Sequence, residues 1–77
     1  MLISKEELEN INKAYKIYDW ESYVILSNDR IIVKDTNKYG RDIDYTNKYE
    51  FIEELKEAIK DDRILTKEQK KIALSYL

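Results

Sequence analysis

Residues 22–46 read SYVILS-ND-RIIVKD-TNKYG-RDIDYT, and this stretch decides the fold of the 77-residue chain. Three short runs rich in β-branched and aromatic residues alternate with polar turn residues, which is the pattern of an antiparallel meander. Asn28-Asp29 predicts a two-residue hairpin turn, and residues 36–40 predict the second loop. The stretch therefore predicts a three-stranded antiparallel sheet.

The strand pairing that these turns impose separates the side chains into two faces, because successive residues of a strand point to opposite sides. The face expected to form the core carries Val24, Leu26, Ile31, Val33, Ile43 and Tyr45. The opposite face carries Tyr23, Ile25, Ile32, Lys34, Asp42 and Asp44. Both edges of the sheet are expected to be open. The alternating acids of the third strand are charged residues of the kind that discourages unwanted strand pairing.

Helical periodicity flanks the meander on both sides. Ser4 and Glu7 have the spacing of a capping box and predict a helix over residues 5–18, with Asn12 on its water-facing side. Capping residues at Asn47 with Glu50 and at Thr66 with Gln69 predict a second helix and a short third one. The predicted apolar stripes are Leu8, Ile11, Tyr15 and Tyr18; then Phe51, Ile52, Leu55, Ala58 and Ile59; and last Ile72, Ala73, Tyr76 and Leu77.

Together these segments predict a single α+β domain over residues 1–77, in the order α-β-β-β-α-α. The helices are expected to pack on one face of the three-stranded meander. The open question is whether the third helix or residues 1–3 fold across the other face.

Composition narrows the classes of function. The chain has no Cys and no His, which excludes disulfides and thiolate or imidazole chemistry, and its single glycine, Gly40, cannot build a phosphate-binding loop. We therefore expect no enzyme and no cofactor. Asp42 and Asp44 lie on one face of a strand, but such alternating acids more often protect an edge than bind a metal, so no metal site is expected.

Charge and hydropathy suggest a cytoplasmic protein. The chain has 14 basic and 16 acidic residues, for a net charge of −2, so bulk charge does not indicate a nucleic-acid binder. No apolar run approaches the ~20 residues of a membrane span, and the N-terminus lacks the apolar region of a signal peptide. Abundant Lys, Ile, Asn and Tyr suggest an AT-rich coding sequence.

Three surface features are candidates for recognition. The first is the strip formed by Tyr23, Ile25 and Ile32 on the second sheet face; if it is exposed, it indicates a partner surface or a dimer. The second is the set of aromatic residues in connections, Trp20, Tyr39 and Tyr49, although Trp20 is expected rather to fill the helix–sheet junction. The third is a series of acids, Asp42, Asp44, Glu50, Glu53, Glu54 and Glu57, which is either a mixed solvated surface or an imitation of a phosphate track.

The meander of residues 22–46, together with those six acids, resembles some phage-encoded anti-CRISPR proteins. The resemblance is one of topology, and it implies a DNA-mimicking inhibitor that blocks a nuclease complex. The order of elements also resembles the double-stranded RNA-binding domain. Lys67, Lys70 and Lys71 at the start of the last helix are similar to the lysines with which that family contacts phosphates.

The leading hypothesis is a non-catalytic protein-binding module. Its more specific form is a phage or mobile-element inhibitor of a host nucleic-acid-processing complex, such as a CRISPR-type nuclease. The first alternative is a nucleic-acid-binding module that uses the three lysines of the last helix. The second is a structural homodimer.

Overall fold

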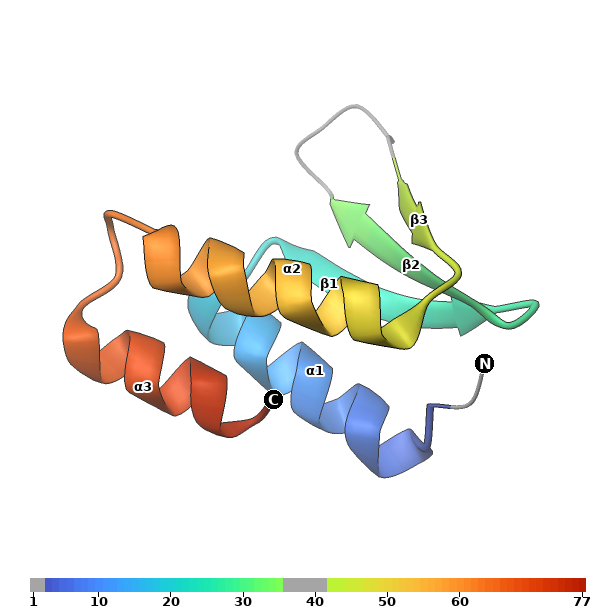
Figure 1. Cartoon of the computed structure of the whole chain (residues 1–77), viewed down its shortest axis with the longest axis horizontal. Coiled ribbons are helices and arrows are strands. Elements are labelled where there is room, and N and C mark those ends of the chain that lie inside the picture. The colour runs from blue at the N-terminus through green and yellow to red at the C-terminus, as the bar shows by residue number, and fades with distance from the viewer. Residues whose placement is uncertain (1–2, 36–41) are drawn as a thin grey trace.

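A computed structural model of the chain describes residues 3–35 and 42–77 (Figure 1). The elements are α1 (Lys5–Tyr18), β1 (Ser22–Ser27), β2 (Arg30–Asp35), β3 (Ile43–Tyr45), α2 (Lys48–Asp61) and α3 (Lys67–Ser75). This order confirms the predicted α+β fold. Tyr39 and the predicted second loop lie outside the described residues.

The sheet has the order β1-β2-β3, and both pairings are antiparallel. The predicted register is confirmed where Val33 pairs with Val24 on one side and with Ile43 on the other. Asn28 and Asp29 connect β1 to β2 with φ angles of 51° and 61°. Two consecutive left-handed residues are typical of a type I′ turn, whose twist matches that of the flanking strands.

All three helices lie on one side of the sheet (Figure 1). α1 contacts β1, α2 contacts β3, and α3 packs against α1 and α2. The predicted option that α3 folds across the other sheet face is therefore wrong. The core between the layers consists of Ile11, Tyr15, Val24, Ile31, Val33, Phe51, Leu55, Ile59 and Ala73.

Part of the predicted core face is exposed instead. Leu26 lies beside the hairpin turn and Ile43 begins the short strand β3, and their side chains are 40% and 52% exposed. Ile72 is likewise exposed, and Leu74 packs against the core from α3.

The outer edge of β1 is occupied at Val24 and Ser22, contrary to the prediction of two open edges. The Asn12 side chain accepts a hydrogen bond from the Val24 N–H at 2.8 Å and donates one to the Val24 carbonyl at 3.0 Å. Asn12 therefore does not face water as predicted, but serves as a substitute for a neighbouring strand. Ser22, the next residue along that edge, donates its N–H to the Asp19 carbonyl at 3.0 Å.

Residues 19–22 connect α1 to β1, and their polar contacts explain why Trp20 does not fill the helix–sheet junction. The Ser22 hydroxyl donates to the Asp19 carboxylate at 2.7 Å, and these polar contacts join α1 to β1. Trp20 points outward and is 77% exposed.

The helix ends follow the predicted capping residues. Ser4 with Glu7 and Thr66 with Gln69 form capping boxes, and the Asn47 side chain accepts from two amides at the start of α2. At the end of α2, the Asp62 carboxylate accepts the N–H groups of Ile64 and Leu65, at 2.7 and 2.8 Å. Among the described residues, the helices are too short or too polar to cross a membrane.

Candidate functional site

The sheet face opposite the helices carries the predicted strip of Tyr23, Ile25 and Ile32, which we call the apolar strip. Ile25 pairs with Ile32 across β1 and β2, and both side chains are half-buried. Tyr23 is 46% exposed. The structure thus brings the three predicted residues together on a face that no described helix covers. The predicted option that residues 1–3 cover this face rests mainly on residues 1–2, which lie outside the described residues.

Two ion pairs border the apolar strip on the side of β3. Arg30 Nη1 lies 2.7 Å from Asp44 Oδ2, and Lys34 Nζ lies 2.8 Å from Asp42 Oδ2. The hydrogen bond to Asp42 raises the pKa of Lys34 above its ordinary value. Both acids are therefore neutralised by neighbours on β2, and the face has an apolar centre and a charged but balanced rim.

The remaining predicted acids lie on α2. Glu53 lies 3.8 Å from the Lys56 ammonium and Glu57 lies 3.9 Å from that of Lys60. Glu54 lies near Tyr45 and, after burial, contributes to the raised pKa of its hydroxyl, and Glu50 is exposed in the first turn of the helix. The structure consequently divides the six acids between the outer sheet face and the helix layer.

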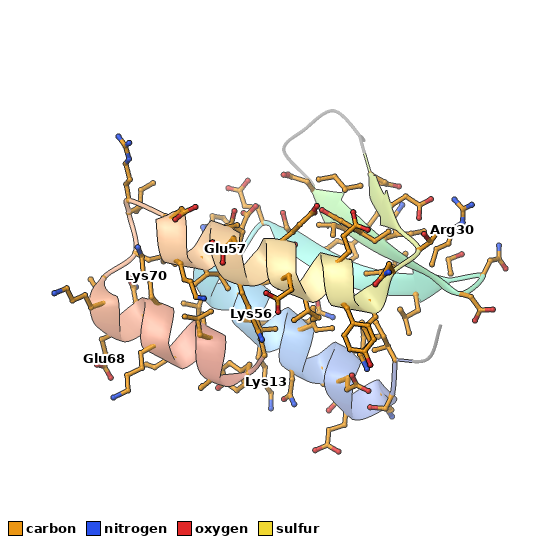
Figure 2. The ribbon with its side chains drawn as sticks, viewed as in Figure 1. Lys13, Arg30, Lys56, Glu57, Glu68 and Lys70 are labelled. Carbon is orange, nitrogen blue, oxygen red and sulfur yellow. The ribbon has the colours of Figure 1, made fainter. Side chains whose placement is uncertain are left out.

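The lysines of the nucleic-acid alternative differ in their surroundings. Lys70 donates from Nζ to the Lys60 carbonyl at 2.7 Å, so it caps the end of α2. Lys67 and Lys71 are exposed, one helical turn apart. Figure 2 shows Lys70 at the end of the molecule opposite Arg30.

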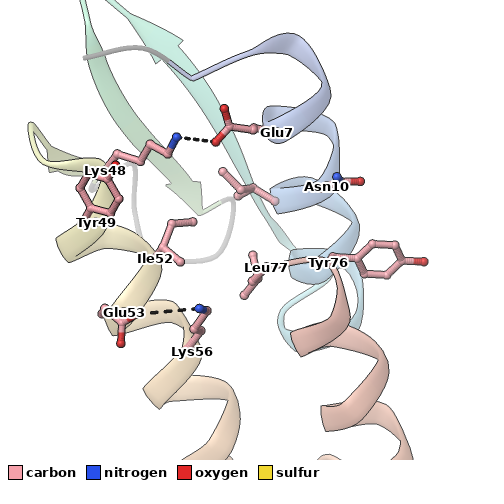
Figure 3. Close-up of a pocket in the computed structure, with 10 residues that line it drawn as sticks. Glu7, Asn10, Lys48, Tyr49, Ile52, Glu53, Lys56, Tyr76 and Leu77 are labelled. Atoms are coloured by element: carbon pink, nitrogen blue, oxygen red, sulfur yellow. Dashed lines mark ion pairs between the residues drawn. The ribbon is translucent and has the colours of Figure 1, made fainter.

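A groove that sequence reasoning missed lies between α1 and α2, where α3 ends (Figure 3). Its volume is about 410 Å³. Lys48 Nζ and Glu7 Oε2 lie 2.6 Å apart at the groove. Their hydrogen bond lowers the pKa of Glu7 and raises that of Lys48. The other lining residues are Asn10, Ile11, Tyr49, Ile52, Glu53, Lys56, Tyr76 and Leu77.

A second missed feature is a cleft of about 250 Å³ between the end of α1, β3 and α2, which we call the aromatic cleft. The Tyr45 and Phe51 ring centres lie 5.1 Å apart, and those of Tyr15 and Tyr18 lie 6.0 Å apart. Burial raises the pKa of Tyr15 and, with the Glu54 hydrogen bond, raises the pKa of Tyr45 to about 12. The described residues that line it are Tyr15, Tyr18, Ile43, Tyr45, Phe51, Glu54, Leu55 and Ala58.

No sequence pattern indicates that the residues lining the groove and the aromatic cleft lie together, because they come from separate elements. Tyr15, Tyr18 and Tyr45 fall on predicted core stripes, so their pattern indicates packing alone. Within the described residues, no group of three or more potential metal ligands lies together. No model of a known protein family, no curated protein and no solved structure matches the chain.

Proposed function

We propose that this chain is a non-catalytic protein-binding module whose partner binds the outer face of the sheet. The observation that carries the proposal is the position of the helices. All three lie on the other face, so Tyr23, Ile25 and Ile32 are left at the surface.

The composition of this face fits the anatomy of a protein interface. Interfaces place aromatic and aliphatic side chains at the centre and polar groups at the rim, where water remains. Here the apolar strip is the centre, and the Arg30–Asp44 and Lys34–Asp42 pairs form part of the rim. Exposed ion pairs contribute little to folding, but they hold long side chains in place and reduce the entropy lost on binding.

The more specific hypothesis, an inhibitor that presents acids in place of nucleic-acid phosphates, draws its support from the acids of α2. Asp42 and Asp44 contribute less to it because their charges are compensated at 2.8 and 2.7 Å. We therefore place the binding energy in the apolar strip, with Asp42 and Asp44 in its rim, since the acids of α2 lie on the helix side of the sheet.

The test compares two matched double variants as baits in a lysate of a low-GC bacterium. Ile25→Thr with Ile32→Thr replaces the two isoleucines of the apolar strip while keeping β-branched residues in the strands. Ile64→Thr with Ile72→Thr makes the same chemical change at two exposed positions away from the sheet. Thermal unfolding of each bait establishes that it is folded.

In nuclease-treated lysate, we expect the wild type and the control variant to capture the same protein. The sheet variant should not capture it. Equal capture by all three baits would overturn the proposal. Capture of nucleic acid only, lost after Lys67→Glu with Lys71→Glu, would replace it with the nucleic-acid alternative. A wild-type dimer in solution that the sheet variant converts to a monomer would assign the face to a second copy of the chain.

A further inference from the structure

We propose that the aromatic cleft binds an organic cation, an ammonium or guanidinium group, between its tyrosine rings and the Glu54 carboxylate. The cleft lies on the helix side of the sheet, so this site is independent of the outer-face site proposed above.

The walls of the cleft are the first argument. Four of its lining side chains are aromatic, and they come from three elements: α1, β3 and α2. The face of an aromatic ring carries partial negative charge and attracts a cation within about 6 Å of its centre. Rings from several directions around a small cavity are the arrangement with which proteins bind alkylammonium groups.

The charge around the cleft is the second argument. Among the described residues that line the cleft there is no Lys or Arg, and Glu54 is the one carboxylate. Glu54 lines the cleft together with Tyr45, close enough to the Tyr45 hydroxyl to contribute to its raised pKa. Glu50 also acts on the Tyr45 hydroxyl, and Asp19 and Asp62 act on that of Tyr18. The described charges that act on these tyrosines are therefore negative, in contrast to the groove between α1 and α2, which Lys48 and Lys56 line.

Size and access complete the argument. A volume of about 250 Å³ accommodates a single side chain or a small quaternary ammonium ion, and is below the range of drug-sized ligand pockets. Ile43, more than half exposed, forms part of the rim, so a ligand reaches the cleft from solvent. Tyr45 keeps its proton at neutral pH as any tyrosine does, so among the described lining residues Glu54 is the source of negative charge.

The test is an NMR titration of the whole chain with tetramethylammonium chloride at constant ionic strength. tert-Butanol, a neutral molecule of the same shape, is the control ligand. Blocked lysine and arginine peptides form a further arm. We expect saturable shifts at the amides of Tyr45, Leu55 and Ala58 with the cations, and weaker binding of the alcohol.

Two variants on one helix separate the role of charge from that of shape. Glu54→Gln keeps a hydrogen-bond acceptor for Tyr45 and removes the charge, and we expect it to weaken cation binding about tenfold. Glu57→Gln makes the same change outside the cleft and should leave the affinity unchanged. If the peptides bind more tightly than tetramethylammonium, the natural cation is a protein side chain. If tetramethylammonium binds more tightly than the peptides, the natural cation is a small molecule.

Three results would overturn the proposal: equal binding of tert-butanol, unaltered affinity in Glu54→Gln, or no saturable shift at the cleft with any cation. The Ile25→Thr, Ile32→Thr variant should bind the cation as wild type does. Failure of this site and failure of the outer-face site are therefore distinguishable.

Discussion

Removing the Asn12 side chain tests whether a helix residue closes the edge of the sheet. In the Asn12→Ala variant, the Val24 N–H and carbonyl lose the partners that now lie at 2.8 and 3.0 Å. A third, longer hydrogen bond, from Asn12 to the Leu8 carbonyl at 3.3 Å, is also lost. Nothing in the hydrophobic pattern changes, because no apolar side chain is altered.

The expected cost follows from the two orphaned backbone groups. A buried unsatisfied donor or acceptor costs about 1–3 kcal/mol. Asn12 is half-buried, so water recovers part of this energy, and we take about 1 kcal/mol for each group, or about 2 kcal/mol in total. Alanine favours the helix over asparagine by several tenths of a kcal/mol, which partly masks the loss.

Asn10→Ala is the control for this gain in helix propensity. Asn10 lies on the same helix, and no side-chain hydrogen bond of Asn10 is found in the part of the chain that the structure describes. The free energies of unfolding of the two variants should therefore differ by about 2 kcal/mol, or roughly 10 °C in melting temperature for a domain of this size. Urea denaturation measures the difference.

Hydrogen exchange locates the effect. The Val24 amide should exchange faster in Asn12→Ala, while the Ser22 amide, bonded to the Asp19 carbonyl, should lose protection only as far as overall stability falls. Asn12→Asp keeps an acceptor but loses the donor, so its free energy of unfolding should lie between those of the two alanine variants. Equal stabilities of Asn12→Ala and Asn10→Ala, with unchanged exchange at Val24, would refute the assignment of edge closure to Asn12.

Further predictions concern the turn, a cap and two titrating groups. Asp29→Gly should stabilise the fold by roughly 0.5–1 kcal/mol, because glycine adopts the left-handed φ without a steric cost, whereas Asp29→Ala should destabilise it; urea denaturation distinguishes them. Thr66→Ala should cost about 1 kcal/mol by the same assay, through loss of the α3 capping box. The lowered pKa of Glu7 means that its pairing with Lys48 stabilises the fold above pH 4.5 and is lost as the pH falls further, so Glu7→Gln should reduce the loss of stability in acid. The raised pKa of Tyr45 stabilises the fold below pH 10, and this contribution is lost as the pH rises towards about 12, so Tyr45→Phe should lose less stability over that range.

Local rules were enough to predict the elements and their register. Asn28-Asp29 determines which residues of β1 and β2 face each other, because a two-residue turn leaves one pairing that is consistent with both strands. Capping residues mark the starts of the three helices for a similar reason, since the side chain satisfies amides only a few positions away.

Features that depend on distances between elements were not predictable in this way. Leu26 and Ile43 have the alternation of core residues, and their exposure follows from where the helix layer ends. Asn12 looks like a solvated helix residue until α1 is placed beside β1. The aromatic cleft exists because α2 returns past β3 to the end of α1, and no spacing within one element encodes that approach.

The sheet edges offer few backbone groups for an added strand, which supports the outer face as the binding surface. A partner that adds a strand needs free backbone groups, but Asn12 occupies those of Val24, and β3 is only three residues long. No described helix covers the outer face, and Arg30 and Lys34 compensate the charges of Asp44 and Asp42. A partner would therefore contact the sheet through side chains, with Ile25 and Ile32 at the centre, which is why two substitutions to threonine should abolish binding while the fold remains.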